Sequence, residues 1–328
     1  MLTKILINYF NWIDNVLPVG GMVRRHPYVM VFKTTNWCWC KCDHCCENSG
    51  PDQPKNYIPA QTIKDYLAQG LKDSYFSREV VFTGGEIISA YKFGDADYVP
   101  DLLMFCNKNN IGADIKTNAA WVNTSFASCV FNDMSRIIGA GRPYSLQISL
   151  SLDNYHKNSM KNNIVFIEKM SHRANVPVAI HLSTFYGDDD MYGELKRELS
   201  NRGVRVRNAI IHNPDSGTYR DVDITDNGII LLTSRATLFD GGRAKNLAEA
   251  EHSKFSQFKF LSTNLHVLMA FDSFGNVTLG ENSGVKIKTN WCTSNNVARP
   301  LMSIRHDLVK NAQFHELRAR IFQNWKMR

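Results

Sequence analysis

The order of secondary-structure signals constrains the fold of this 328-residue chain most strongly. From residue 28 to about 213, short apolar runs rich in β-branched residues alternate with segments of helical period, which predicts successive βα units and a parallel sheet. Strands are expected at 29–35, 79–83, 113–117, 146–152, 177–183 and 204–211. Helices are expected near 60–71, 97–109, 124–138, 158–173 and 191–201.

Six parallel strands with intervening helices can form an open-sided barrel, about three quarters of the eight-stranded version, with ligands at the C-terminal ends of the strands. The predicted fold class is therefore α/β, a partial (β/α)6 TIM-like barrel with parallel strands, followed by an α+β extension. We expect a helical cap over 1–28, the barrel over 29–213 and the C-terminal extension over 214–328.

Cysteine is concentrated in one loop directly after the first predicted strand. Five of the eight cysteines lie between positions 38 and 46, and Cys38, Cys42 and Cys45 have the spacing C-x3-C-x2-C. Three thiolates at this spacing can hold three corners of a cubane iron–sulfur cluster and leave the fourth iron without a protein ligand. Cys40 and Cys46 are surplus to this assignment, so substituting either should spare the cluster, although Cys46 could compete with Cys45.

A second motif, Gly84-Gly85-Glu86, ends the apolar run 80–83. The cysteine loop followed by this motif resembles the radical S-adenosylmethionine (SAM) superfamily over roughly residues 28–215. The resemblance implies a [4Fe–4S] cluster on the three spaced cysteines, with the amino and carboxylate groups of SAM on the fourth iron. It also implies reductive cleavage of SAM to methionine and a 5′-deoxyadenosyl radical that takes a hydrogen atom from the substrate.

The same resemblance implies which residues contact SAM. Glu86 would bind its amino group, beside the two glycines, whose missing Cβ atoms let a backbone approach a ligand. The position before the third cysteine is usually aromatic in this family and is His44 here. Asn118, Ser149 and Ser151 are candidates for ribose and carboxylate contacts, and ordinary end-of-strand hydrogen bonding is the alternative for each.

The C-terminal part resembles a SPASM or twitch extension that lacks the cysteines for auxiliary clusters. Cys292 is the only thiol beyond Cys129, so we predict one cluster per chain. Without an auxiliary cluster as electron acceptor, a redox-neutral outcome such as epimerisation is favoured over oxidation. Epimerisation needs a hydrogen-atom donor, and Cys292 is the candidate catalytic residue. A buried structural thiol is the alternative for Cys292, and Tyr186 or Tyr219 are alternative donors.

Composition and charge argue against several classes of function. Hydrophobic residues make up 44% of the chain and charged residues 21%, as in a globular protein with a large core. The net charge of +7 is scattered, without a basic run interleaved with aromatics, so no nucleic-acid partner is expected. The sequence has no window near the roughly 18 apolar residues of a membrane span, and its start does not resemble a signal peptide. We therefore expect a cytoplasmic protein with reduced thiols and no membrane partner.

The sequence predicts a radical SAM enzyme that acts on a small polar substrate, such as a sugar, an aminoglycoside or a nucleotide-like molecule. An external one-electron reductant of the flavodoxin or ferredoxin type would be its partner. One alternative is a radical SAM maturase that modifies a ribosomally synthesised peptide paired to a sheet edge. Another is a non-catalytic iron–sulfur or zinc protein that senses redox state. Zinc sites usually take their ligands from two separated pairs, whereas the cysteines outside this loop are isolated.

Overall fold

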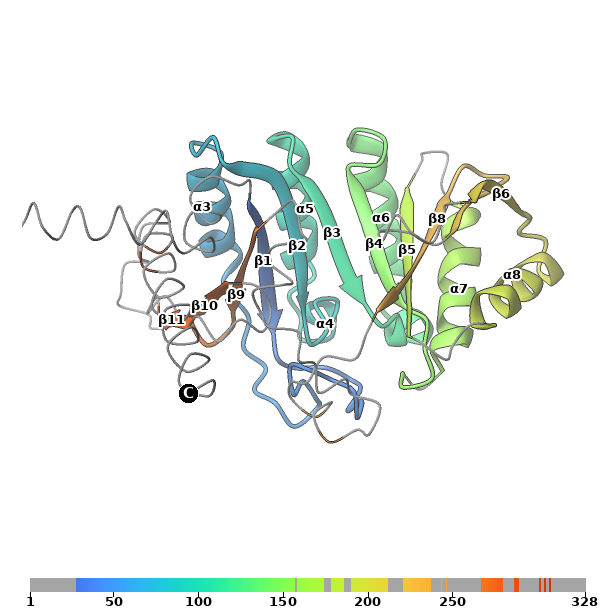
Figure 1. The fold of residues 1–328 in the computed structure, drawn as a ribbon, viewed down its shortest axis with the longest axis horizontal. Helices are drawn as coiled ribbons and strands as arrows, with labels where there is room; N and C mark the ends of the chain where they lie inside the picture. Colours follow the sequence, from blue (N-terminus) through green and yellow to red (C-terminus); the bar gives the residue numbers. More distant parts are fainter. Residues whose placement is uncertain are drawn as a thin grey trace, which may run out of the picture. The chain divides into compact units, whose positions relative to one another are not determined.

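The computed structural model describes residues 28–156, 158–173, 178–185, 190–211, 221–236, 267–279 and 286–288, together with residues 243, 246, 301, 304 and 307 (Figure 1). The chain divides into two compact units. One comprises residues 1–32, 61–78 and 254–328, and the other comprises 33–60 and 79–253. Strands β1 (Tyr28–Thr35) and β2 (Phe76–Gly84) begin in the first unit and end in the second.

The second unit is built around parallel strands. β2, β3 (Gly112–Thr117), β4 (Leu146–Ser151), β5 (Ala179–Phe185) and β8 (Ile230–Ala236) lie side by side, and each pairs in parallel with the next. β1 lies beside β2, and the order continues through β8 to β7 and β6 without returning to β1. The predicted α/β class, with a mostly parallel and open sheet, is confirmed.

The sixth parallel strand does not come from the expected residues. The segment predicted at 204–211 forms β6 (Val206–Ile211), which pairs antiparallel with β7 (Asp221–Thr225), and β7 pairs antiparallel with β8. β8 fills the place beside β5 instead. The chain reverses between β7 and β8 in a turn at Gly228, whose φ of 83° suits glycine. One strand of the parallel set therefore comes from the predicted C-terminal extension.

Helices follow the strands much as the sequence predicts. The five predicted helices are observed to within three residues at either end. They are α3 (Ala60–Gly70), α5 (Tyr98–Lys108), α6 (Ala127–Ala140), α7 (Ser159–Ser171) and α8 (Met191–Asn201), and the short α4 (Ser89–Lys92) and η1 (Ala120–Asn123) accompany them. Figure 1 shows α5 and α6 on one face of the parallel strands. In β3, Ala113, Ile115 and Thr117 are buried, while Asp114 and Lys116 alternate with them.

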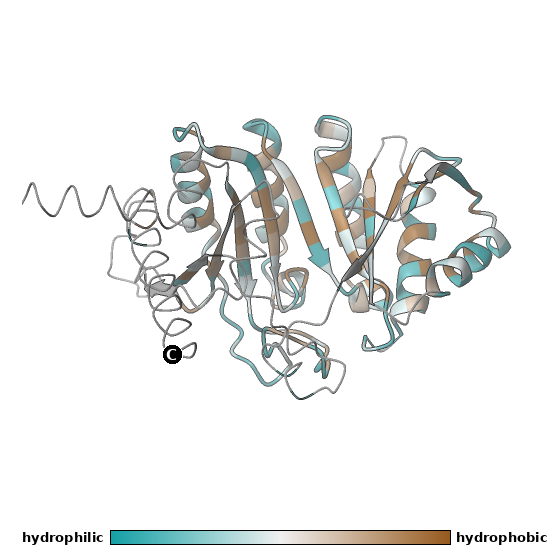
Figure 2. Cartoon of the chain, viewed as in Figure 1, coloured by the Kyte–Doolittle hydropathy of each residue, from teal (hydrophilic) through white to brown (hydrophobic). Residues whose placement is uncertain are grey.

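The other face of the parallel strands carries a group of polar side chains. Pairing places Lys116 beside Ser149 and Ser149 beside His181. Residues paired across parallel strands point to the same face, so these side chains share it. Hydrophobic and hydrophilic residues alternate along the strands accordingly (Figure 2). We call this surface the polar face.

The first unit contains an antiparallel set of strands. β9 (Val267–Asp272) pairs with β10 (Asn276–Leu279), which pairs with β11 (Lys286–Lys288). Phe271 of β9 stacks on Phe32 with ring centroids 4.8 Å apart and packs against Tyr66 at 5.0 Å. Among the described residues, none of the helices combines the length and apolar character that crossing a bilayer needs.

Several predictions fall on residues outside the described ranges. These are the N-terminal cap up to residue 27, the hydrogen-atom donor candidates Cys292, Tyr186 and Tyr219, and most of the extension after residue 236. The proposed division into cap, barrel and extension stays a prediction.

Candidate functional site

The cysteine loop, residues 36–50, follows β1 and is closed at its base. The Cys38 N–H donates to the Gly50 carbonyl at 3.2 Å. Lys33, near the end of β1, reaches Glu47 on the far side of the loop, with Nζ and Oε1 2.5 Å apart and the Lys33 side chain only 8% exposed. A shielded ion pair and a backbone bond thus hold the two ends of the loop together.

The Gly-Gly motif at the end of β2 packs directly on the chain that enters the cysteine loop. A Cβ on Gly84, whose φ is 115°, would lie 2.4 Å from the Thr35 carbonyl oxygen, and one on Gly85 would lie 2.1 Å from that of Trp37. The N–H groups of Gly85 and Glu86 donate to these same two oxygens, at 2.6 and 2.9 Å. Only glycine fits this approach. The approaching group is the chain's own backbone, and contact of these glycines with SAM stays a prediction.

Glu86 is fully buried and its carboxylate binds three donors. Oε1 accepts the Ile88 N–H at 3.2 Å, and Oε2 accepts the Thr117 hydroxyl at 2.9 Å and the Asn118 N–H at 3.1 Å. Burial raises the pKa of Glu86 to about 7, against the effect of these hydrogen bonds. A carboxylate has about four acceptor positions, so one remains for a further donor such as an ammonium group.

Asn118 connects the Glu86 carboxylate to the cysteine loop. Its backbone N–H binds Glu86, and its side-chain Nδ2 donates to the Cys38 sulfur at 3.3 Å. The Asn118 Oδ1 is held by the Ala120 N–H at 2.9 Å, which fixes the orientation of the amide. The structure therefore brings together three of the predicted residues, Cys38, Glu86 and Asn118, although 80 positions separate Cys38 from Asn118.

Three sulfur atoms of the loop interact, and one of them belongs to a cysteine predicted to be surplus. Hydrogen bonds from the Cys38 and Cys42 thiols lower the pKa of Cys40 to about 3. The same hydrogen bonds are the largest cause, and burial the second, of a raised pKa for Cys38 and for Cys42. Cys45 is close enough to Cys42 to raise the pKa of Cys42 further through charge repulsion. Four sulfurs thus share one small region, and thiolates are the form that binds metal.

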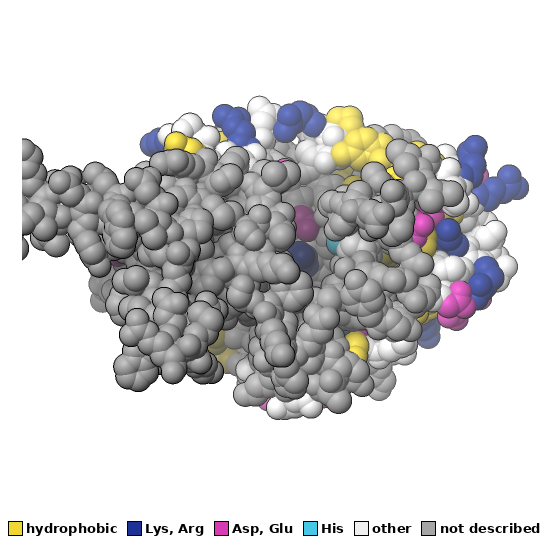
Figure 3. Space-filling model, in the orientation of Figure 1, with side chains coloured by type: hydrophobic (Ala, Val, Ile, Leu, Met, Phe, Trp, Pro, Cys, Tyr) yellow, Lys and Arg dark blue, Asp and Glu magenta, His cyan; other side chains and the backbone are white. Residues whose placement is uncertain are grey.

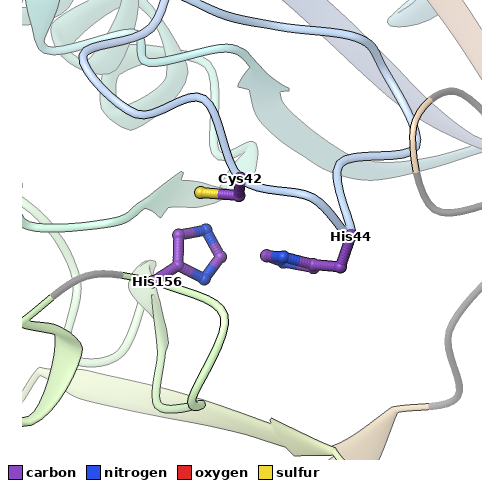
Figure 4. A group of neighbouring side chains, drawn as sticks. All are labelled: Cys42, His44 and His156. Carbon is purple, nitrogen blue, oxygen red and sulfur yellow. The ribbon is translucent and has the colours of Figure 1, made fainter. Parts of the chain in front are cut away.

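Two histidines face the same region. One ligand atom each from Cys42, His44 and His156 lie within 4.8 Å of one another, and Figure 4 shows the three side chains turned toward a common point. His156 follows β4, and its Nδ1 is 2.9 Å from Oδ2 of the buried Asp153. A carboxylate that binds one imidazole nitrogen orients the other toward a metal in many protein sites.

Charge and burial set the state of this histidine group. Burial, as the main cause, and the charge of His156, as the second, lower the pKa of His44 to about 4. The His44 imidazole is therefore neutral at pH 7. Burial opposes ionisation of Asp153, but the hydrogen bond and charge of His156 hold the pKa of that carboxyl below its usual range. The His44 ring packs on His156 and Tyr155, with centroids 4.6 and 4.9 Å apart.

Arg243 was not assigned a role from the sequence, yet it contacts the cysteine loop. Its Nε donates to the Cys42 carbonyl at 2.9 Å and its guanidinium donates to the Ser49 carbonyl at 2.7 Å. Its backbone N–H donates to the Cys45 carbonyl at 2.9 Å. About 200 residues separate the partners, so no local motif could have revealed this contact.

Aromatic side chains cover the loop on one side. Trp37 packs edge-on against Trp39 and Phe93, with centroids 5.1 and 4.9 Å apart, and Trp39 stacks on Phe126 at 6.1 Å. Lys92 lies 5.0 Å above the Trp37 ring. These contacts give the loop an apolar flank, and apolar surroundings of this kind suit either a cluster or a single metal ion.

The two predicted serines lie on the polar face. The Ser149 hydroxyl donates to Asp114 Oδ1 at 2.7 Å and lies 3.2 Å from His181 Nδ1. Ser151 pairs with Ser183 of β5. Ser149 is thus engaged by neighbouring strands, and the roles proposed for both serines in SAM binding stay predictions.

The residue types around the loop are those that bind an iron–sulfur cluster. It offers three motif cysteines on one loop, partly buried, with an amide N–H directed at the Cys38 sulfur, as cluster sulfurs commonly receive. The group of Cys42, His44 and His156 also fits a single ion such as zinc, which takes sulfur and nitrogen ligands.

No protein-family model matches the chain, and no curated protein matches it. Solved structures do match. Streptococcus suis SuiB bound to S-adenosylmethionine is 14% identical with a TM-score of 0.42, covering 87% of this chain and 65% of that chain. SuiB bound to precursor peptide SuiA is 15% identical with a TM-score of 0.41, covering 87% and 64%. Native anSMEcpe with bound AdoMet is 12% identical with a TM-score of 0.38, covering 77% and 74%. This chain thus spans less than two thirds of SuiB, and likenesses at such scores establish neither a family nor a function.

Proposed function

We propose that this chain is a radical SAM enzyme in which Cys38, Cys42 and Cys45 hold a single [4Fe–4S] cluster. The observation that carries the proposal is the adjacency of two motifs that are distant in sequence. Asn118 binds the Glu86 carboxylate with its backbone and the Cys38 sulfur with its side chain. An amino group bound by Glu86 would therefore lie close to a metal centre bound by Cys38.

When bound and reduced, such a cluster supplies the electron that cleaves SAM to a 5′-deoxyadenosyl radical. The chain's own residues would bind and orient SAM and shield the site from water. Glu86 offers its remaining acceptor position to the SAM amino group, and Asn118 fixes the distance between that carboxylate and Cys38. Trp37 and Phe93 exclude water, and Arg243 holds the loop through two carbonyls.

We assign the substrate to the small polar class, since the polar face of the parallel strands carries the side chains of Lys116, Ser149 and His181. The reaction proposed is hydrogen-atom abstraction with a redox-neutral outcome such as epimerisation, with Cys292 as hydrogen-atom donor. A flavodoxin or ferredoxin would reduce the cluster, and the location would be cytoplasmic. A maturase that acts on a ribosomally synthesised peptide is the alternative within the same chemistry.

The decisive experiment is anaerobic reconstitution with iron and sulfide, addition of SAM and dithionite, and measurement of 5′-deoxyadenosine by mass spectrometry. We expect one [4Fe–4S] cluster per chain and formation of 5′-deoxyadenosine. Full cluster loading with intact SAM would contradict the proposal.

A second candidate function rests on the group of Cys42, His44 and His156, whose ligand atoms are close enough together for a single metal ion. In that case the chain is a non-catalytic zinc or redox-sensing protein. Metal analysis of anaerobically purified protein separates the two candidates. Stoichiometric zinc that His156→Ala removes, with iron absent after reconstitution, would favour the second.

A further inference from the structure

Four polar side chains form a continuous hydrogen-bonded row across four neighbouring parallel strands. They are Asp114 on β3, Ser149 on β4, His181 on β5 and Ser234 on β8, and we call them the polar row. The Ser149 hydroxyl lies 2.7 Å from Asp114 Oδ1 and 3.2 Å from His181 Nδ1. His181 Nε2 lies 2.6 Å from the Ser234 hydroxyl.

The donors and acceptors give the row a direction. Ser149 has a single hydroxyl hydrogen and donates it to Asp114, so it accepts a hydrogen from His181 Nδ1. This assigns the Nδ1–H tautomer to a neutral His181, whose Nε2 then accepts the hydrogen of Ser234. Burial, together with the charge of Lys116, lowers the pKa of His181 to about 4, consistent with a neutral ring. Every hydrogen of the row therefore points toward Asp114.

Ser234 is the end of the row that can accept a ligand. Its hydrogen is given to His181, which leaves lone pairs on its oxygen, and its side chain is only partly buried. At the other end, burial raises the pKa of Asp114, which makes this carboxylate a better proton acceptor. Acidic, basic and histidine side chains are visible close together near the middle of the view in Figure 3.

The surroundings of Ser234 indicate the chemistry of the ligand. Strand pairing places Ser151 beside Ser183 and Ser183 beside Ser234, so three hydroxyls lie in one layer of the polar face. Asp114 is charge-balanced by Lys116, which lowers its pKa against the effect of burial. A layer of neutral hydroxyls suits a ligand with several hydroxyl groups and no net charge.

We propose that the polar row binds a hydroxyl group of an uncharged, polyhydroxylated, sugar-like substrate and accepts its proton. The ligand proton moves to Ser234, the Ser234 proton to His181 Nε2, the Nδ1 proton to Ser149 and the Ser149 proton to Asp114. The ligand oxygen keeps the electron pair of the broken O–H bond, and no oxidant or reductant is consumed. The proposal rests on the proposed function, because it names the substrate of the same enzyme.

The test uses nitrogen NMR of the full, anaerobically reconstituted chain carrying 15N-histidine, with SAM and without reductant, and myo-inositol as the polyhydroxylated probe. We expect His181 in the Nδ1–H tautomer and a shift of its Nε2 signal on addition of myo-inositol. Betaine, which has no O–H or N–H donor, should leave the signal in place. Ser234→Ala should weaken the apparent affinity for myo-inositol at least tenfold. An Nε2–H tautomer, no response to myo-inositol, or unchanged affinity in Ser234→Ala would overturn the proposal.

Ser135→Ala is the control, because the Ser135 hydroxyl binds the Phe131 carbonyl within α6 and has no part in the row. It should change the affinity for myo-inositol less than twofold. The 5′-deoxyadenosine assay on the same wild-type sample tests the proposed function separately. A myo-inositol response without SAM cleavage would overturn the radical chemistry alone, and SAM cleavage without the response would overturn the polar row alone.

Discussion

The cysteine loop and the polar row are built in opposite ways. The loop takes its sulfur atoms from one contiguous stretch, and side chains and backbone from several other segments hold it in place. The row takes one residue from each of four strands, and the regular pairing of those strands is what aligns them. The loop should therefore fail when a local contact is removed, whereas the row should fail when the charge or tautomer of one member changes.

The largest effect is expected from Cys38→Ala. The loss of one of three motif thiolates should abolish stoichiometric iron binding and reduce 5′-deoxyadenosine formation at least 100-fold. Iron analysis and the product assay measure this. Cys46→Ser is the control, because the Cys46 sulfur lies 4.0 Å from the Glu47 carboxylate at the loop's exit. Equal iron loss in both variants would contradict the C-x3-C-x2-C assignment.

Cys40→Ser tests which of the loop cysteines bind iron. The motif predicts that iron is retained, although the Cys40 sulfur is hydrogen-bonded to the Cys38 and Cys42 thiols. Loss of iron in Cys40→Ser with retention in Cys45→Ser would show that the ligands are Cys38, Cys40 and Cys42.

A large effect on stability is expected from Gly85→Ala. The added Cβ would lie 2.1 Å from the Trp37 carbonyl oxygen, a backbone atom that cannot move without displacing the loop. The free energy of unfolding should fall by about 3 kcal/mol. Gly139→Ala in α6 is the matched control, since its new Cβ meets nothing within 4 Å, and it should stabilise the helix by about 0.5–1 kcal/mol. Chemical denaturation measures both, and equal effects would contradict the packing argument.

The polar row should make stability depend on pH. The pKa of His181 is about 4 in the folded chain and about 6.5 when unfolded, so the unfolded chain binds more protons between these values. The free energy of unfolding should therefore fall as the pH drops from 6.5 to 4, by up to about 3 kcal/mol. His181→Gln should remove this component when unfolding is compared at pH 7 and pH 5. An unchanged difference between the two pH values would show that His181 is not buried in its neutral form.

The smallest effect is expected from Arg243→Ala, which removes two charge-assisted hydrogen bonds to loop carbonyls. We expect a loss of about 2 kcal/mol in the free energy of unfolding and slower iron incorporation. Arg136→Ala is the control, because that side chain is 59% exposed and pairs with Asp133 on the surface. Surface pairs of this kind contribute little. Identical behaviour of the two variants would contradict a role of Arg243 in holding the loop.

The sequence predicts well whatever depends on neighbouring residues. The strands at 113–117 and 146–152 match β3 and β4 closely, because periodicity and β-branched residues are local signals. The cysteine spacing and Gly84-Gly85-Glu86 are local in the same sense. Their adjacency in space follows from the C-terminal ends of parallel strands meeting at one edge of the sheet.

What the sequence does not predict depends on strand order and distant contacts. Residues 204–211 continue the βα rhythm, yet β8 takes the place beside β5. The sequence does contain a hairpin signal, Asn227-Gly228, between the alternating segment 221–225 and the apolar run 229–232, since Asn-Gly favours a tight reversal. The polar row and the contacts of Arg243 had no such signal, because each joins residues that lie far apart in the chain.

The position of β8 late in the sequence brings a residue of the polar row and a residue that binds the cysteine loop close together in the chain. Ser234 at the open end of the row and Arg243 on the cysteine loop are nine positions apart, a stretch that spans at most about 32 Å. A slip of β8 by one residue would turn Ser234 away from the ligand side. Arg243 follows Ser234 by only nine positions, so we expect an insertion or deletion between them to disturb the polar row and the cysteine loop together.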